Sequence, residues 1–147
     1  MIHCIYGTDQ DSVGQMIAGN FIRNTGYPIT GGYTAMGFIR NNALVGQVIF
    51  DNFTGANIDI HIHCPTCFTR STIKSVYNYV FNFKKAERLS AKPFHTNEKL
   101  LQLLPRLGFE YEYTQERYFK EDSGEIFDAV NFKLLKKNIP KWVKLDA

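Results

Sequence analysis

The sequence lacks the features that mark secreted and membrane proteins. It has three cysteines in 147 residues, an odd number that cannot all pair, so a disulfide-stapled scaffold is not expected. No apolar run approaches the roughly 20 residues that a membrane-spanning helix needs. The N-terminus, Met-Ile-His-Cys-Ile-Tyr, has neither the charged segment nor the long apolar stretch of a secretory signal. We therefore expect a cytoplasmic protein with reduced thiols and no membrane partner.

The sequence also lacks a large excess of charge of either sign. Seventeen Lys and Arg against 14 Asp and Glu give a formal net charge of +3. The basic residues are scattered except near the C-terminus, where five lysines gather: Lys133, Lys136, Lys137, Lys141 and Lys144. A solvated tail explains this cluster, and we do not expect nucleic acid as a partner. The length suits a single domain over residues 1–147, which would bury about 70% of the surface of the unfolded chain.

One stretch of the sequence changes its hydrophobic period. Residues 57–63, Asn-Ile-Asp-Ile-His-Ile-His, alternate strictly and predict a strand with isoleucines on one face and Asp59, His61 and His63 on the other. Cys-Pro-Thr-Cys at 64–67 interrupts the alternation. A helix is predicted after Phe68, with one apolar stripe: Ile73, Val76, Tyr77, Val80 and Phe81. Such a strand-to-helix junction favours anion binding, because the N–H groups of the first helical turn are unsatisfied.

The first part of the chain predicts a strand, a helix and a hairpin. Residues 2–6 are typical of a short strand, and Ser12 and Gln15 have the spacing of a capping box. The expected helix ends at Gly26 and has an apolar face made of Val13, Met16, Ile17 and Phe21. Strands over 33–40 and 44–50 are joined at Asn41-Asn42, a pair that tolerates the positive φ of a tight hairpin.

The second part predicts a parallel crossover and a long hairpin. A strand over 88–92 follows the central helix, and the strand-helix-strand order implies a right-handed parallel connection. Thr96 or Asn97 caps a further helix that bends at Pro105 and ends at Gly108. Strands over 109–119 and 126–134 flank a turn at 122–124. The whole order fits an α/β fold with a mixed, mostly antiparallel sheet and helices on both faces.

Several short motifs follow one another towards the C-terminus. Asn97 stands eleven residues before Gly108-Phe109, and the chain continues with Glu112, Glu116-Arg117, Asp128, Leu134-Leu135 and Trp142. This series resembles the second half of the GNAT superfamily of acyl-CoA N-acyltransferases, closest to the ribosomal-protein N-terminal acetyltransferase branch and small phage-encoded relatives. With the element order, the resemblance covers about residues 33–135. It implies a GNAT-like domain that takes acetyl-CoA as acyl donor and an amine as acceptor.

The resemblance puts the coenzyme A pyrophosphate at the start of the central helix. Where the family has a glycine-containing loop, this chain has Phe68 at the Gln/Arg position and Thr69 and Ser71 at the two glycine positions. N–H groups, hydroxyls and one guanidinium can still receive a pyrophosphate there. The implied cofactor-binding set is His63, Phe68, Thr69, Arg70, Ser71, Thr72 and Asn97. Asn97 would bond the pantetheine arm, or serve only as a helix N-cap.

The reaction that the resemblance implies is direct attack of an amine on the thioester carbonyl. We expect His61 to be the base, because an unperturbed pKa near 6.5 leaves it mostly neutral, with Asp59 and Glu112 as further candidates. A backbone N–H near His63 would polarise the carbonyl. The tyrosine that many family members use as general acid falls at Leu104, so water or His63 would supply that proton. A weak base suits an α-amine, with pKa about 7.7 to 8, better than a lysine side chain.

Other interpretations of the same residues stay open. His61, His63 and the Cys-x-x-Cys at 64–67 have the residue types of a zinc site, and the two cysteines also resemble a glutaredoxin-type redox motif. The polar strand face could be no more than a hydrogen-bonded surface. A degenerate GNAT fold could act as a protein-binding module without catalysis, which the missing glycines favour. The aromatic strands and the Trp142 tail would suit a homodimer.

Overall fold

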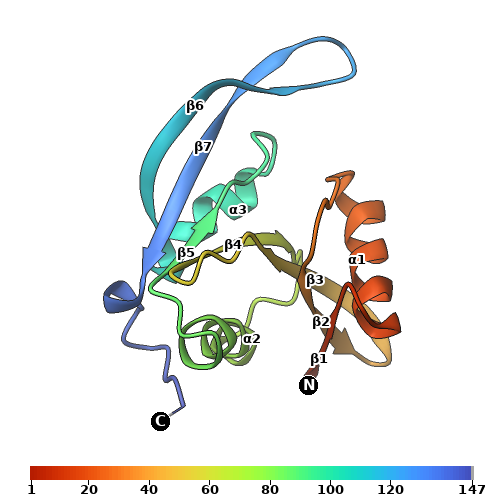
Figure 1. The fold of residues 1–147 in the computed structure, drawn as a ribbon, viewed down its shortest axis with the longest axis vertical. Coiled ribbons are helices and arrows are strands. Elements are labelled where there is room, and N and C mark those ends of the chain that lie inside the picture. The colour runs from red at the N-terminus through yellow and green to blue at the C-terminus, as the bar shows by residue number, and fades with distance from the viewer. Residues whose placement is uncertain (147) are drawn as a thin grey trace.

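The fold is built on one seven-stranded sheet with the strand order β1-β2-β3-β4-β5-β7-β6 (Figure 1). The computed structural model describes residues 1–146. Only β4 and β5 pair in parallel, so the sheet is mixed and mostly antiparallel, as predicted. The strands are β1 (Ile2–Thr8), β2 (Thr34–Arg40), β3 (Ala43–Asp51), β4 (Asn57–His63), β5 (Arg88–Ala91), β6 (Glu110–Lys120) and β7 (Ile126–Leu135).

Helices cover both faces of this sheet, which also confirms the prediction. The α-helices are α1 (Ser12–Thr25), α2 (Arg70–Tyr77) and α3 (Glu98–Leu103). A π-helical segment, Asn78–Phe83, extends α2, and a 3₁₀ segment, Leu104–Leu107, extends α3; another 3₁₀ turn, Lys136–Asn138, follows β7. One core cluster joins α1 to β2 and β3, and the other joins α2 and α3 to the opposite face. No helix within residues 1–146 is long and apolar enough to cross a membrane.

Strand β4 separates the two faces of the sheet, as its alternation predicts. Ile58 and Ile60 are buried in the cluster beneath α2, together with all five residues of the predicted helical stripe. The side chains of Asp59, His61 and His63 must then point to the face of α1. Helix α1 packs mainly on β1, β2 and β3, so this face of β4 and β5 is left partly uncovered. The β6–β7 hairpin arches over it (Figure 1).

Helix α1 begins differently from the prediction. Its N-cap is Asp11, whose carboxylate accepts a hydrogen bond from Gly14 N at 2.7 Å, so the predicted capping box of Ser12 and Gln15 is wrong. The carboxylate also accepts from Thr8 N, which ties the helix to the end of β1 and explains why Asp11 is preferred. Val13 and Met16 are exposed, whereas Ile17 and Phe21 are buried as predicted.

The predicted turns have the expected backbone conformations. Asn41 and Asn42 have φ of 51° and 64° between β2 and β3, and Gly26 has φ of 71° after α1. Asn97 is the N-cap of α3, whose chain tightens into the 3₁₀ segment at Pro105. Gly108 then turns the chain into β6 with φ of 97°. The positive φ of Asn41, Asn42, Gly26 and Gly108 is a geometry that a β-branched or bulky residue would resist.

Two glycines of α1 should respond in opposite ways to the same change. A Cβ at Gly14 would clash with the backbone of Thr8, while one at Gly19 would meet nothing within 4 Å. We expect Gly14→Ala to lower the free energy of unfolding by about 1–3 kcal/mol through overpacking. Gly19→Ala should raise it by about 0.5–1 kcal/mol, because Ala favours a helix interior. Urea unfolding of both variants tests this, and stabilisation by Gly14→Ala would contradict the close crossing of β1 and α1.

Candidate functional site

The candidate site begins where β4 and β5 separate. Residues 57–60 of β4 pair in parallel with residues 88–91 of β5, and the pairing stops there. Residues 61–63 of β4 stay bonded to β3 on their other side. Because N–H groups alternate in direction along a strand, at least one from residues 61–63 points into the gap. The gap therefore combines an unpaired backbone donor with the side chains of His61 and His63.

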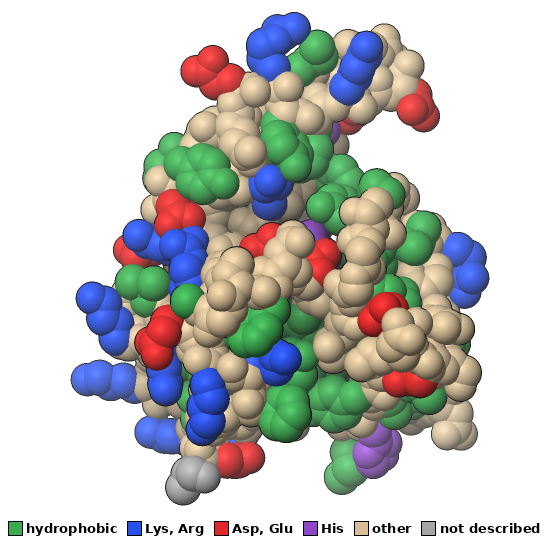
Figure 2. All heavy atoms as spheres, viewed as in Figure 1, with side chains coloured by type: hydrophobic (Ala, Val, Ile, Leu, Met, Phe, Trp, Pro, Cys, Tyr) green, Lys and Arg blue, Asp and Glu red, His purple; other side chains and the backbone are tan. Residues whose placement is uncertain are grey.

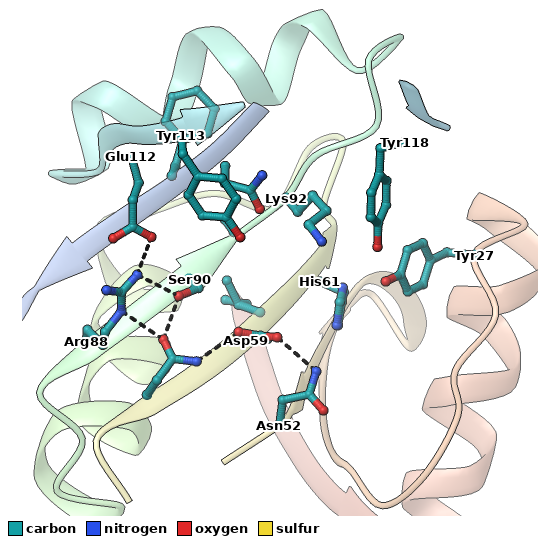
Figure 3. Close-up of a pocket in the computed structure, with 15 residues that line it drawn as sticks. Tyr27, Asn52, Asp59, His61, Arg88, Ser90, Lys92, Glu112, Tyr113 and Tyr118 are labelled. Atoms are coloured by element: carbon teal, nitrogen blue, oxygen red, sulfur yellow. Dashed lines mark hydrogen bonds and ion pairs between the residues drawn. The ribbon is translucent and has the colours of Figure 1, made fainter. Parts of the chain in front are cut away.

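A polar cavity of about 430 Å³ lies on the face that α1 leaves uncovered. Its floor is formed by side chains of β4 and β5, and its walls include Tyr27, Tyr113 and Tyr118 (Figure 3). The space-filling view has carboxylate side chains and a histidine at the centre of this face, below the overhanging hairpin (Figure 2). All three predicted catalytic residues line this cavity: Asp59, His61 and Glu112.

His61 is held by two neighbours. Its Nε2 lies 2.9 Å from Asp51 Oδ1, and both side chains are nearly buried. The ring of Tyr27 packs against the imidazole, with the ring centroids 4.8 Å apart and the planes tilted by 31°. A carboxylate oxygen only accepts hydrogen bonds, so Nε2 carries the hydrogen, and in the neutral ring Nδ1 is the nitrogen with the lone pair. Nδ1 has no hydrogen-bond partner among residues 1–146, and the residue lines the polar cavity.

The two carboxylates of the cavity belong to one hydrogen-bond network. Asp59 accepts from Asn52 and from Asn57, both at 2.9 Å. Arg88 connects Asn57 to Glu112, donating to Asn57 Oδ1 at 3.1 Å and to Glu112 Oε1 at 2.6 Å. The hydrogen bond from Arg88 lowers the pKa of Glu112. Glu112 therefore stays ionised and is a poor proton acceptor at neutral pH.

A narrow groove leads from the polar cavity towards α2. Two cavities of about 300 and 130 Å³ lie along it, and both are lined by Ile62, His63, Asn97 and Leu100. Phe68 and Cys64 line the end near α2. Three of the predicted cofactor-binding residues, His63, Phe68 and Asn97, are thus brought together. Asn97 Oδ1 also caps α3 by accepting from Leu100 N at 3.2 Å.

His63 has a buried polar partner on the neighbouring strand. Its Nδ1 lies 3.1 Å from Oε1 of Gln47, which stands directly opposite on β3 and is only 1% exposed. The same oxygen accepts from Asn24 Nδ2 of α1 at 3.1 Å. Burial lowers the pKa of His63, which favours the neutral ring.

The start of α2 is already hydrogen-bonded within the chain. Thr69 Oγ1 accepts from Thr72 N at 3.2 Å, and Thr69 N donates to Thr72 Oγ1 at 2.9 Å, which completes a capping box. Thr72 is buried, and its hydroxyl donates to the carbonyl of Cys67. Ser71 is exposed, and the Arg70 guanidinium lies 5.9 Å from the centre of the Trp142 ring. Of the predicted phosphate-binding side chains, Arg70 and Ser71 are therefore the ones free to reach a ligand.

The two cysteines of this loop are joined. Cys64 and Cys67 form a disulfide, so the prediction of reduced thiols is wrong for this pair. Their Cα atoms are 5.3 Å apart, within the usual range, and Gly46 of β3 leaves the space that Cys67 occupies. Both cysteines belong to the core cluster on the α2 face, opposite His61 and His63. Within residues 1–146 no three His, Cys, Asp or Glu side chains are grouped as metal ligands.

Several side chains of the site are not evident from the sequence pattern. Asp51, Gln47 and Asn24 hold the two histidines, but none belongs to a recognisable motif. The register of the β3–β4 pair could have revealed two of them, because Gln47 stands opposite His63 and Asp51 stands diagonal to His61. Asn24 and Tyr27 come from the first helix and its following loop, so only the tertiary fold brings them to the site.

Solved structures share this architecture. This chain superposes on a mutant of spermidine N-acetyltransferase from Vibrio cholerae with a TM-score of 0.75 and 14% identity. The superposition covers 97% of this chain and 96% of the other. Against the ribosomal-protein alanine N-acetyltransferase from Escherichia coli, the TM-score is 0.66 at 13% identity over 92% and 94% of the two chains. For a GNAT-family acetyltransferase from Bacillus anthracis, the TM-score is 0.59 at 16% identity, over 70% of this chain and 66% of the other. The chain has the GNAT fold.

The sequence is only 13 to 16% identical to these three structures. No protein-family model and no curated protein sequence matches it. The chain spans 64% and 62% of the length of two further proteins of similar structure. In this GNAT fold, the gap between β4 and β5 holds the groove, and the start of α2 has hydroxyl side chains where the family pattern has glycines.

The Arg88–Glu112 ion pair should stabilise the fold in a pH-dependent way. A carboxyl whose pKa is lowered on folding contributes stability above its unfolded pKa, about 4.3, and loses it as pH falls through the lower folded pKa. We expect Arg88→Met to reduce the free energy of unfolding by about 1.5–3 kcal/mol at pH 7. The difference from wild type should shrink at pH 3, as measured by urea unfolding.

A neighbouring lysine provides the control for this change. Lys133 Nζ lies 3.9 Å from both Glu110 and Glu112, farther than a hydrogen bond. Lys133→Met should therefore change the free energy of unfolding by less than about 0.5 kcal/mol. An equal loss for Arg88→Met at pH 7 and pH 3 would show that the arginine acts by packing and not through the Glu112 carboxylate.

Proposed function

We propose that the chain is an acetyl-CoA-dependent N-acetyltransferase that transfers the acetyl group to an amine by direct attack in a ternary complex. The acceptor would be a protein N-terminal α-amine or a small-molecule amine. The observation that carries this proposal is the meeting of the polar cavity and the narrow groove at His61, where β4 and β5 separate. The GNAT fold supports it, since its neighbours include N-acetyltransferases.

The groove fits the slender pantetheine arm of acetyl-CoA. His63, Phe68 and Asn97 would line the arm. Arg70 and Ser71, exposed at the start of α2, would contact the pyrophosphate. When bound, acetyl-CoA supplies a thioester carbonyl. A backbone N–H from residues 61–63 can polarise that carbonyl, because β5 does not use it.

The amine would bind in the polar cavity, with the base beside it. As the amine nitrogen attacks, the C–N bond forms and the C–S bond breaks. One amine proton passes to Nδ1 of His61. The thiolate leaves with the electron pair of the C–S bond and takes a proton from a water molecule, and the hydroxide that forms takes up the proton held by His61. Asp51 holds the His61 ring in the tautomer that this transfer requires. Asp59 and Glu112 would attract the ammonium form of the acceptor.

A non-catalytic binding module is the second candidate of a different class. The closed capping box at the start of α2 is the observation that would favour it. The open groove and the ordered His61–Asp51 pair favour the enzyme, and the comparisons with acetyltransferases give the module no support.

Calorimetric titration of acetyl-CoA tests coenzyme binding. We expect saturable binding that the double variant Arg70→Ala, Ser71→Ala weakens by about tenfold or more, because a charge-assisted contact and a hydroxyl are lost. Arg106→Ala, at an exposed position of the 3₁₀ segment after α3, should bind like the wild type. Absence of binding at millimolar acetyl-CoA would rule out the enzyme and direct attention to a protein partner.

Replacement of His61 tests the base. His61→Gln should lower kcat by about 10²- to 10⁴-fold while leaving acetyl-CoA affinity unchanged. His3→Gln, an exposed histidine of β1, is the matched control and should keep full activity. Steady-state kinetics with a panel of peptides and small amines would measure both. If His61→Gln retains wild-type kcat, proton removal must be assigned to another group.

A further inference from the structure

Among the described strands, the outer half of the β6–β7 hairpin pairs only with itself. β5 pairs with residues 132–135 of β7, and β6 is the last strand of the sheet. Residues 113–120 and 126–131 therefore form a two-stranded ribbon that rises beyond the sheet (Figure 1). A bulge between Gln115 and Phe119 interrupts its ladder. Because a two-stranded hairpin is only marginally stable on its own, contacts from outside the ribbon must hold it.

His95, in the loop between β5 and α3, holds the tip of this ribbon. Its ring stacks on that of Phe127, with the centroids 3.8 Å apart and the planes inclined by 10°. Its Nε2 lies 2.8 Å from Oε1 of Glu121, next to the hairpin turn. Nδ1 is buried and has no hydrogen-bond partner among residues 1–146. The desolvation of this nitrogen offsets part of what the stack and the hydrogen bond contribute, so the contact can open at a modest free-energy cost.

Phe94, the preceding residue, contacts both the ribbon and the groove. Its ring lies 5.1 Å from that of Phe119 in β6 and 5.6 Å, edge to face, from that of Tyr27, measured between centroids. Tyr27 packs on His61 of β4, whereas Phe94 follows β5, so the two rings meet across the gap between these strands. Both residues line the cavity of about 300 Å³. The loop that holds the ribbon is therefore also a wall of the groove.

The loop itself, residues 92–97, has little internal bonding. Within it, a single backbone hydrogen bond joins Asn97 N to Phe94 O at 2.9 Å. Asn97 then begins α3 as its N-cap. The Lys92 ammonium lies 4.1 Å from the centre of the Tyr118 ring, in the bulge of β6. A segment with so few backbone bonds moves at low cost, and its side chains carry any displacement to the ribbon.

We propose that residues 92–97 act as a latch that holds the ribbon over the polar cavity and links its position to the filling of the groove. Tyr118 of the ribbon forms a wall of that cavity, so release of the latch opens the cavity. A ligand in the groove would pack against Phe94 and favour the closed latch, and the closed latch would strengthen the binding of that ligand equally. This inference rests on the proposed function for the groove ligand, acetyl-CoA. His95 is a positioning residue, since it contacts the ribbon and lines neither cavity.

Hydrogen exchange of the free protein tests the latch. His95→Ala removes the stack on Phe127 and the bond to Glu121, so the amides of the ribbon should exchange about 10-fold faster or more. Amides of residues 132–135 should keep the wild-type rate, because β5 still holds them. His3→Ala, at an exposed position of β1, is the matched control and should leave exchange of the ribbon unchanged. Wild-type exchange of the ribbon in His95→Ala, or equal acceleration of residues 132–135, would overturn the latch.

The first turn of α3 tests the link to the groove without a ligand. The amides of Leu100 and Leu101 donate to the side chain and the carbonyl of Asn97, at the end of the latch. Release of the ribbon by His95→Ala should loosen this end of the loop, so both amides should exchange faster than in the wild type. Unchanged exchange of these two amides, with a faster ribbon, would overturn the link.

Coenzyme A is the second probe of the link. At saturation it should slow exchange of the ribbon in the wild type by about fivefold or more, and Phe94→Ala should remove this effect. Saturable binding that leaves exchange of the ribbon unchanged would also overturn the link. If coenzyme A does not bind, the proposed function fails, while the two measurements on the free protein still decide the latch and the link.

Discussion

The short parallel contact between β4 and β5 is the constraint on which the site depends. Four residues of each strand pair, and then the strands leave one another. A longer contact would satisfy the backbone of residues 61–63 and close the groove; a shorter one would detach β5, β6 and β7 from the rest of the sheet. The antiparallel β3–β4 pair continues to His63 and keeps β4 rigid beyond the separation. The cleft therefore lies along the edge of β4 that β5 leaves unpaired, and the pairing of the other edge with β3 keeps it open.

The alternation of β4 was the part of the site most open to prediction. A period of two determines which side chains enter the core and which face the cleft, and the isoleucines and the polar residues divided accordingly. The partners of those polar residues were not predictable in the same way. Asp51 and Gln47 require the register of the β3–β4 hairpin, Asn24 and Tyr27 require the docking of α1, and Arg88 requires the parallel pairing.

Two sequence predictions are wrong because they depend on local contacts that a residue pattern does not record. Asp11 and Ser12 can both cap α1, and Asp11 prevails because its carboxylate also bonds to the end of β1. The pairing of Cys64 with Cys67 follows from the turn between β4 and α2 and from the space above Gly46, neither of which an odd cysteine count reveals. The hydrophobic periods of helices and strands, in contrast, depend on many residues, so they predict an element even where one local contact differs.

The capping box of α2 lowers the binding free energy that a phosphate would gain at the start of this helix. A glycine-rich loop offers N–H groups that water alone occupies, whereas here a diphosphate would compete with Thr69 Oγ1 for the N–H of Thr72. An N-cap is worth about 1 kcal/mol, so this competition costs a factor of about five in affinity. More of the affinity for an acyl donor would then reside in the groove along β4. When the acyl donor carries the pantetheine thioester without the nucleotide, this protein would therefore lose less affinity than a relative with the glycines.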